Sequence, residues 1–212
     1  MQLDTLAKGN TKKSQITKAR LLSVAIVAFA EKGFAGTTVD EIVGAAGINK
    51  RMVYHYFGSK EKLYQAVLKE VYERLANIEL KTFSHPDDPV KVIEQVIHIY
   101  FAFLQDNPEF VNLLLWENLN RGRGIEQADF ELTKDPVLHH LDETLQQGIA
   151  MGRFRSDVDV RHFLISLIGL CLIYFSNRYT LSKTLHINMA SPKILKEGLH
   201  HVTKMVMRGI RL

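Results

Sequence analysis

The sequence predicts an all-α protein of about nine helices, with a three-helix head at the N-terminal end and a larger helical body after it. Two observations lead to this prediction. No stretch shows the sustained alternation of apolar and polar residues that marks a half-buried β-strand. A helix-capping residue also stands before a proline at 88–89, 107–108, 135–136 and 191–192, and proline is favoured at the first position of a helix.

The first helix of the head is predicted over residues 14–33, where apolar residues recur at helical spacing. Gly33 is expected to end it, because glycine adopts the left-handed conformation that closes helices. Residues 1–13 carry three lysines and no periodic apolar pattern. We interpret them as a flexible basic arm, which is either a plain disordered tail or an arm that contacts DNA, as such arms do in some helix-turn-helix proteins.

Two short helices are predicted between residues 38 and 57. Thr38 and Glu41 have the spacing of a capping box, Gly47 is placed to close the first helix, and Asn49 can cap the second. Two short helices joined by about three residues with a glycine are typical of a helix-turn-helix, whose second helix enters the major groove of DNA. A helical hairpin with a solvated basic face is the alternative. The side chains left to face outward are Lys50, Arg51, Tyr54 and His55.

This region resembles the DNA-binding domain of TetR/AcrR-type transcriptional repressors. The resemblance covers roughly residues 14–70 without a gap, and its most specific part is Tyr-x-x-Phe-x-Ser-Lys-Glu-x-Leu, which begins at Tyr54. It implies phosphate contacts for Thr38, Tyr54, His55 and Lys60, and positions near bases for Lys50 and Arg51. Asn49 and Arg51 replace residue types that are usual in the family, which leaves the operator sequence open. The candidate DNA-binding residues are Thr38, Asn49, Lys50, Arg51, Tyr54, His55 and Lys60.

The basic charge is concentrated in the predicted head. Residues 1–62 contain 10 Lys/Arg and 5 Asp/Glu, a net charge of +5, whereas the remainder contains 27 − 10 = 17 and 23 − 5 = 18, a net charge of −1. This distribution is expected of a DNA-reading module joined to a neutral body. We therefore predict a basic arm at 1–13, a DNA-binding domain at 14–62, and a ligand-binding and dimerisation domain at 63–212.

The body is predicted to contain helices that start near residues 60, 89, 108, 136, 157 and 192, with loops at 83–90, 120–132 and 179–191. The last two helices, about 157–178 and 192–210, are rich in apolar residues. The corresponding helices of TetR-like proteins form a four-helix dimer interface, so the resemblance implies a homodimer, which also suits a palindromic operator. The longest apolar run, 163–175, is shorter than the roughly 20 residues that span a bilayer, so no membrane partner is expected.

The body is also expected to hold a pocket for an unidentified small-molecule effector, as helical bundles often do. The histidine pairs 139–140 and 200–201 point about 100° apart on a helix, so no metal is expected, and no cofactor is expected either. The candidate lining residues combine aromatic surface with polar groups, although for each one alone ordinary packing is favoured over ligand contact. They are Tyr100, Phe103, Trp116, Glu117, Asn120, Tyr174 and Asn177.

The leading functional hypothesis is a homodimeric repressor that an effector releases from a palindromic operator. The alternative is an architectural, nucleoid-associated DNA-binding protein of the same fold without an effector. An enzyme is disfavoured, because the sequence contains no Gly-rich phosphate loop, Gly-x-Ser-x-Gly or His-Glu-x-x-His motif. A single cysteine, Cys171, and a first segment without the apolar core of a secretory signal predict a cytoplasmic, nucleoid-associated protein.

Overall fold

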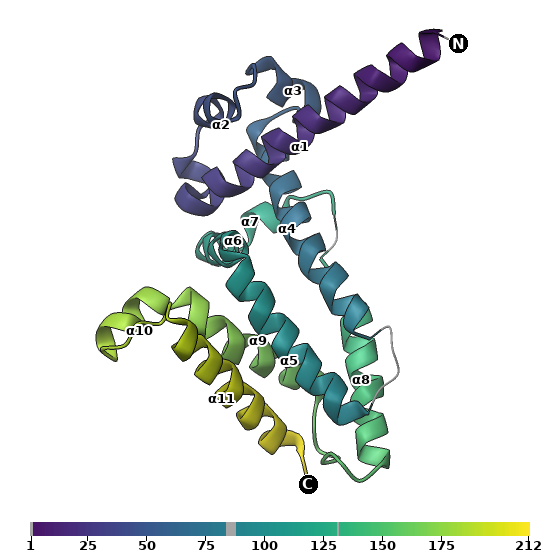
Figure 1. The fold of residues 1–212 in the computed structure, drawn as a ribbon, viewed down its shortest axis with the longest axis vertical. Coiled ribbons are helices and arrows are strands. Elements are labelled where there is room, and N and C mark those ends of the chain that lie inside the picture. The colour runs from purple at the N-terminus through teal and green to yellow at the C-terminus, as the bar shows by residue number, and fades with distance from the viewer. Residues whose placement is uncertain (1, 84–87, 131) are drawn as a thin grey trace. The chain divides into compact units, whose positions relative to one another are not determined.

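The computed structural model describes residues 2–83, 88–130 and 132–212, and of residues 2–13 the backbone alone. Within these residues the regular structure consists of eleven helices, and the only extended pairing is an isolated bridge between Phe154 and Arg211. The predicted all-α fold class is therefore confirmed (Figure 1).

Apart from the start of α1, the helices that were predicted begin and end close to the residues that the capping signals indicated. Two short helices, α7 and α10, were not predicted, and they lie in segments that were expected to be loops. Helices of four and seven residues are too short to produce a periodic apolar pattern. In chain order the helices are α1 (Gln2–Gly36), α2 (Val39–Ala46), α3 (Arg51–Phe57), α4 (Lys60–Thr82), α5 (Pro89–Asp106), α6 (Pro108–Leu119), α7 (Arg123–Glu126), α8 (Asp135–Ala150), α9 (Val160–Ser176), α10 (Arg178–Thr184) and α11 (Pro192–Ile210).

The chain divides into two compact units. The first contains Met1–Tyr72 and Asn112–Glu131, and the second contains Glu73–Val111 and Leu132–Leu212. Helices α4 and α6 each contribute residues to both units. This division describes contacts between residues, so the predicted functional boundary at residue 62 stays a prediction.

The start of α1 differs from the prediction. Helical backbone begins at Gln2, whereas residues 1–13 were expected to form an arm without regular structure. The segment mixes good helix formers with five weak ones, Asp4, Thr5, Gly9, Asn10 and Thr11, but lengthening a helix that already exists costs far less than nucleating one. At the other end, Gly33 has a φ of 69° and a ψ of 177°, so it interrupts the helix where a stop was predicted.

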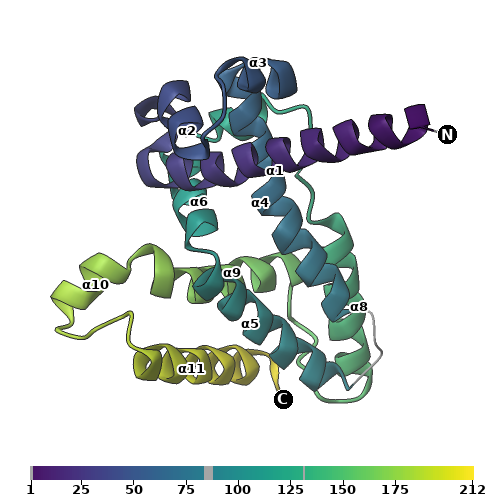
Figure 2. The ribbon, with the colours of Figure 1, turned by 45° about the horizontal axis from the view of Figure 1, so that its top comes forward.

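The core of the first unit is formed by α1 and the helices that pack on it. Helices α1 and α2 are in contact, and Figure 2 shows α2 and α3 lying beside α1. The fully buried side chains include Leu21 and Phe29 from α1, Ile42 from α2, Val53 from α3 and Leu63 from α4. Each helix therefore contributes an apolar face to one core, which positions α2 and α3 without using their outer faces.

The second unit is organised around α5. Helix α5 packs against α8, α9 and α11 (Figures 1 and 2), and buries nine of its side chains. Its cap is the predicted one, because Oδ1 of Asp88 accepts the Val90 N–H at 2.9 Å. Among the described residues no single helix is both long and apolar enough to cross a bilayer. Helices α9 and α10 meet that length and composition test only as a pair, across a bend of 72°.

Candidate nucleic-acid interface

The first helix of the candidate interface, α2, is fixed at both ends by the predicted caps. Thr38 Oγ1 accepts the Glu41 N–H at 3.2 Å, and Glu41 Oε2 accepts the Thr38 N–H at 2.9 Å. Gly47 closes the helix in the left-handed conformation, with a φ of 64°. The capping box is therefore confirmed, and Thr38 already uses its hydroxyl within the protein.

Glu41 is also the partner of Lys32 on α1. The ammonium of Lys32 lies 2.7 Å from Glu41 Oε1. The hydrogen bond from Lys32, helped by those from Thr38, lowers the pKa of Glu41 to about 2. Because this carboxylate stays ionised at all ordinary pH values, α1 and the start of α2 remain linked there.

The second helix, α3, presents one buried side chain to the core and several polar ones to the outside. Asn49 Oδ1 accepts the Arg51 N–H at 2.9 Å, so Asn49 supplies a hydrogen bond to the start of the helix, although the residue in the N-cap position is Lys50 and not Asn49 as predicted. Val53 is fully buried, whereas Tyr54 is 50% exposed and both Arg51 and His55 are exposed. The helix therefore offers a guanidinium, a phenol and an imidazole on its open face.

The two lysines among the candidate residues have partners within the protein. Lys50 lies 2.8 Å from Oδ2 of Asp40, in a pair whose members are both largely exposed. Lys60 Nζ lies 4.3 Å from the centre of the Phe34 ring. Exposed ion pairs and cation–π contacts are weak because water screens them, so a DNA phosphate could displace either one at small cost.

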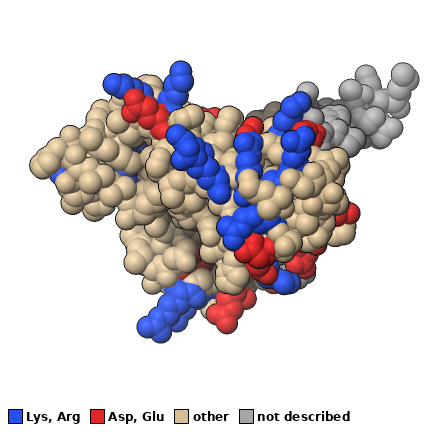
Figure 3. Space-filling view, turned by 90° about the horizontal axis from the view of Figure 1, so that it is seen from below, with Lys and Arg blue, Asp and Glu red and all other residues tan. Residues whose placement is uncertain are grey.

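Helix α3 is tied to α1 by two contacts on its inner side. The Ser14 hydroxyl donates to the Tyr56 hydroxyl at 3.1 Å, and Lys18 Nζ lies 5.4 Å from the centre of the Phe57 ring. These contacts hold α3 from behind and leave its exposed face unobstructed within the first unit. On the face of the molecule drawn in Figure 3, which is seen from below, basic and acidic side chains are both present. The candidate interface is identified from its named residues.

The residues predicted to line one effector pocket are divided between the two units. Trp116, Glu117 and Asn120 lie in the first unit, and the other four lie in the second. The Trp116 side chain already has a partner within the first unit, because its indole N–H donates to the Ala30 carbonyl at 3.2 Å. The remaining four are Tyr100 and Phe103, which are both 3% exposed, and Tyr174 and Asn177 at the end of α9.

Tyr100 belongs to a buried polar cluster in the second unit. Its hydroxyl donates to Glu79, and Lys134 lies 2.5 and 2.7 Å from the two Glu79 carboxylate oxygens. Burial raises the pKa of Glu79, and the charge and hydrogen bond of Lys134 oppose that rise. The cluster joins α4, α5 and the start of α8, which is a sufficient structural role for Tyr100.

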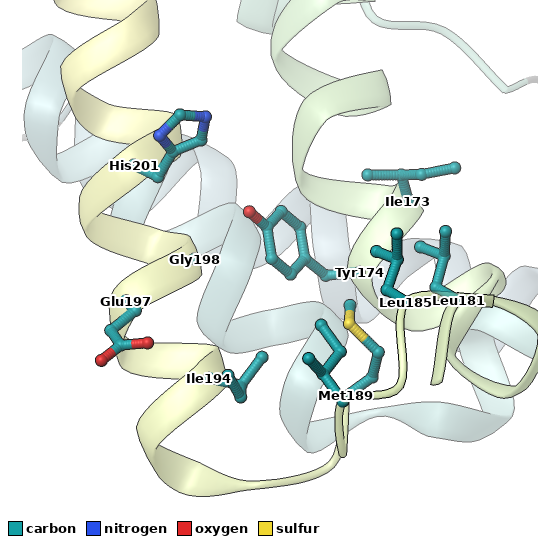
Figure 4. A pocket seen from close by; sticks show the side chains of 10 residues that line it. Ile173, Tyr174, Leu181, Leu185, Met189, Ile194, Glu197, Gly198 and His201 are labelled. Carbon is teal, nitrogen blue, oxygen red and sulfur yellow. The ribbon is translucent and has the colours of Figure 1, made fainter. Parts of the chain in front are cut away.

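Tyr174 lines a pocket of about 360 Å³ between α9, α10 and α11. Figure 4 shows its ring directed toward Gly198 on α11, with Leu181, Leu185 and Met189 on the other side. A Cβ on Gly198 would lie 2.3 Å from Tyr174 Cε1, so the ring and this glycine are in direct contact. The lining is mostly apolar.

A larger pocket, of about 610 Å³, lies in the first unit. Glu117 and Asn120 line it, together with Phe34, Tyr64 and residues around α7 that the sequence did not suggest. Tyr64 and Glu117 are 53 residues apart in the chain, and no local pattern indicates that they meet.

The described side chains contain no group of three His, Cys, Asp or Glu residues placed to hold a metal ion. Cys171 is buried, and desolvation raises the pKa of its thiol to about 12. Its thiol is therefore protonated and unreactive at neutral pH.

Comparison with known proteins gives matches to both parts of the chain. A family model described as "Bacterial regulatory proteins, tetR family" matches residues 21–67, and one described as "Tetracyclin repressor-like, C-terminal domain" matches residues 89–206. The HTH-type transcriptional repressor NicS of Pseudomonas putida is 31% identical over 196 residues, which cover 92% of each chain.

More distant relatives also match over nearly the full length. The HTH-type transcriptional regulator RutR of Escherichia coli is 24% identical over 209 residues, or 96% of each chain. The crystal structure of a TetR transcriptional regulator from Chloroflexus aurantiacus superposes with a TM-score of 0.70 at 21% identity, covering 95% of this chain and 99% of that one. The superposition with the Chloroflexus aurantiacus structure is evidence for the fold alone.

Proposed function

This chain belongs to the TetR family of bacterial transcriptional regulators, and we propose that it is a homodimeric repressor which a small-molecule effector releases from a palindromic operator. Family membership makes it a DNA-binding transcriptional regulator. We infer that regulation and not catalysis is its role. We infer also that it acts at the nucleoid, where operator DNA lies.

The open face of α3 is the observation that supports operator recognition best. Arg51 and Tyr54 point away from a core that buries Val53 completely, so they are free to approach DNA. A guanidinium can bind the O6 and N7 atoms of guanine together, which makes Arg51 the proposed base-reading residue, with Lys50 beside it. The proposed phosphate contacts are Thr38, Tyr54, His55 and Lys60, and Asn49 completes the set at the helix start.

The homodimer is supported by apolar side chains that α9 and α11 leave exposed. Ile165 is 65% exposed, Ile173 43% and Met205 48%. Burying such side chains against a second copy is favourable by roughly 25 cal/mol per Å² of apolar area. We propose that α9 and α11 of two chains form the dimer interface, which would allow two α3 helices to read half-sites about 34–36 Å apart.

The proposed effector acts through differential affinity. A ligand that binds the DNA-competent form less tightly than another form lowers the affinity for DNA. The coupling free energy between the two sites is typically about 1–3 kcal/mol. Because α4 runs through both units without interruption, it is the element through which a bound effector would affect the head.

Selection of bound duplexes from a random DNA pool at near-physiological salt tests this proposal. We expect an enriched palindrome, together with a dimeric mass in analytical ultracentrifugation. Tight binding without an enriched sequence would instead favour the architectural, nucleoid-associated alternative. A monomer with no salt-dependent affinity for any duplex would refute both.

Three variants separate base reading from phosphate contacts. Arg51→Ala should lose on the order of 1–3 kcal/mol at the cognate site and little on random DNA. Tyr54→Ala and Lys60→Ala should weaken binding to all sequences, and Lys60→Ala should also reduce the salt dependence. Lys183→Ala, at an exposed lysine of α10, is the matched control and should bind like the wild type. Equal losses on cognate and random DNA for all three variants would contradict these assignments.

A further inference from the structure

The pocket of the first unit contains a buried carboxylate on its wall. Glu117, near the end of α6, is 2% exposed and lines the pocket of about 610 Å³. This volume lies in the range of small-molecule sites, about 300–1,000 Å³. A charged group at the wall of such a space can interact directly with whatever enters it.

Glu117 has hydrogen-bond partners but no cation. Its Oε1 accepts the Tyr64 hydroxyl at 2.7 Å, and its Oε2 accepts the Ile125 N–H at 3.0 Å. No Lys, Arg or His among the side chains that the structure describes forms an ion pair with it. A carboxylate can accept about four hydrogen bonds, so each oxygen has a free acceptor site, and burying an unpaired charge is unfavourable.

The backbone at Gly124 packs directly against the Glu117 carboxylate. A Cβ on Gly124 would lie 2.6 Å from Glu117 Oε1 and 2.7 Å from Tyr64 Cε1, so only glycine fits at this position. Gln65 Nε2 donates to the Gln127 carbonyl at 2.7 Å, which holds the segment after α7 against α4. The carboxylate is therefore held in place before any ligand arrives, which reduces the entropy cost of binding.

The remainder of the pocket offers apolar surface near Glu117 and cations at its edge. The rings of Phe34 and Tyr64 lie 5.2 Å apart and both line the pocket. Arg121 and Arg123 also line it, but both are exposed, so water screens their charge. The buried end of the pocket thus combines one unpaired negative charge with aromatic surface.

We propose that this pocket binds a small organic molecule that carries a protonated amine, with the ammonium against Glu117 and the apolar part against Phe34 and Tyr64. The ammonium supplies the cation and the hydrogen-bond donors that the buried carboxylate lacks. The inference rests on the proposed ligand response, since it names the chemical class of the effector.

The test uses three sets of size-matched probes: benzylamine, benzyl alcohol and benzoate; 2-phenylethylamine, 2-phenylethanol and phenylacetate; and tryptamine, tryptophol and indole-3-acetate. Saturation-transfer NMR on the full-length protein detects binding, and calorimetry measures the affinity of each probe that binds. We expect amines to bind while their alcohols and acids do not. Failure of all three amines, or equal binding of an amine and its alcohol, would overturn the proposal.

Glu117→Gln locates the site. The amide keeps the size of the side chain and can still accept from the Ile125 N–H while donating to the Tyr64 oxygen, so the fold should be retained. We expect amine affinity to fall roughly tenfold or more in Glu117→Gln. It should be unchanged in Glu126→Gln, which removes an exposed carboxylate of α7 that does not line the pocket. Amine affinity that survives in Glu117→Gln would overturn the assignment.

The probe experiment contains no DNA, so its outcome is independent of operator recognition. Loss of the amine site would leave an enriched palindrome unaffected, and an absent palindrome would leave the measured amine affinities unaffected. The two proposals can therefore fail separately.

Discussion

The buried ion pair of the second unit leads to a quantitative prediction for Lys134→Met. Methionine keeps much of the length and apolar area of lysine but removes the ammonium that lies 2.5 and 2.7 Å from the Glu79 carboxylate oxygens. Glu79 would then remain buried, with a side chain only 1% exposed and Tyr100 as its remaining partner.

The expected magnitude follows from the exposure of the two side chains. Removing one partner of a fully buried pair typically costs about 3–5 kcal/mol, whereas an exposed pair contributes about 0–1 kcal/mol. Because the Lys134 side chain is 34% exposed, water already weakens its interaction, so we expect an intermediate loss of about 2–3 kcal/mol in the free energy of unfolding at pH 8.

The loss should depend on pH. Burial raises the pKa of Glu79 above its ordinary value of 4.5, and Lys134 opposes that rise, so the variant should have a still higher pKa. A carboxyl whose pKa is raised in the folded state binds more protons there than in the unfolded chain, so stability falls as pH increases above 4.5. The deficit of Lys134→Met should therefore be largest near pH 8 and smaller near pH 5.

Urea denaturation at pH 5 and pH 8, at one protein concentration, measures both effects. Lys183→Met is the matched control, because the Lys183 side chain is exposed on α10, and it should change stability by less than about 0.5 kcal/mol. A deficit below about 1 kcal/mol at pH 8, or equal deficits at the two pH values, would refute the argument that Lys134 compensates a buried charge.

The remaining predictions concern local packing and capping, and urea or acid denaturation measures each. Gly148→Ala should lower the free energy of unfolding by about 1–3 kcal/mol, because its Cβ would lie 2.0 Å from Cδ2 of the buried Phe154 ring. Gly44→Ala has no neighbouring group within 4 Å and should raise the free energy of unfolding by about 0.5–1 kcal/mol. Effects of the same sign in the two variants would contradict this contrast. Thr38→Ala should lose about 0.5–2 kcal/mol through the capping box, and an unchanged urea midpoint would show that the box is not stabilising. Because the pKa of Glu41 is lowered from 4.5 to about 2, its carboxylate stabilises the fold above pH 4.5, and this stability is lost as the pH falls toward 2. The stability of Glu41→Gln should therefore depend less steeply on acid pH. Acid unfolding curves of Glu41→Gln and wild type that overlay would contradict this.

The local signals of the sequence were sufficient for most of the helices and for the helix-turn-helix. Thr38 and Glu41 lie three residues apart and form the capping box that their spacing predicts. Prolines 89, 108, 136 and 192 each lie within the first two residues of a helix. Such signals are reliable because the interacting groups are neighbours in the chain, so little depends on the rest of the fold.

Two parts of the local prediction were incomplete for a related reason. Helices α7 and α10 are too short to show a period, and α1 continues through a segment whose composition alone did not indicate a helix. In such segments the neighbouring structure overrides a weak helix propensity, and a search for periodic apolar residues does not detect that influence.

The sequence by itself determined the fold class, most of the helix boundaries and the family of this protein, since these follow from local spacing and from a motif of contiguous residues. Only the tertiary structure decided which distant side chains meet. Glu117 meets Tyr64 across 53 residues, and Lys134 meets Glu79 across 55. The residues expected to line one effector pocket were separated into two units for the same reason. The position of a helix in the chain does not specify which neighbour its polar side chains will contact, because that depends on the simultaneous packing of all the helices.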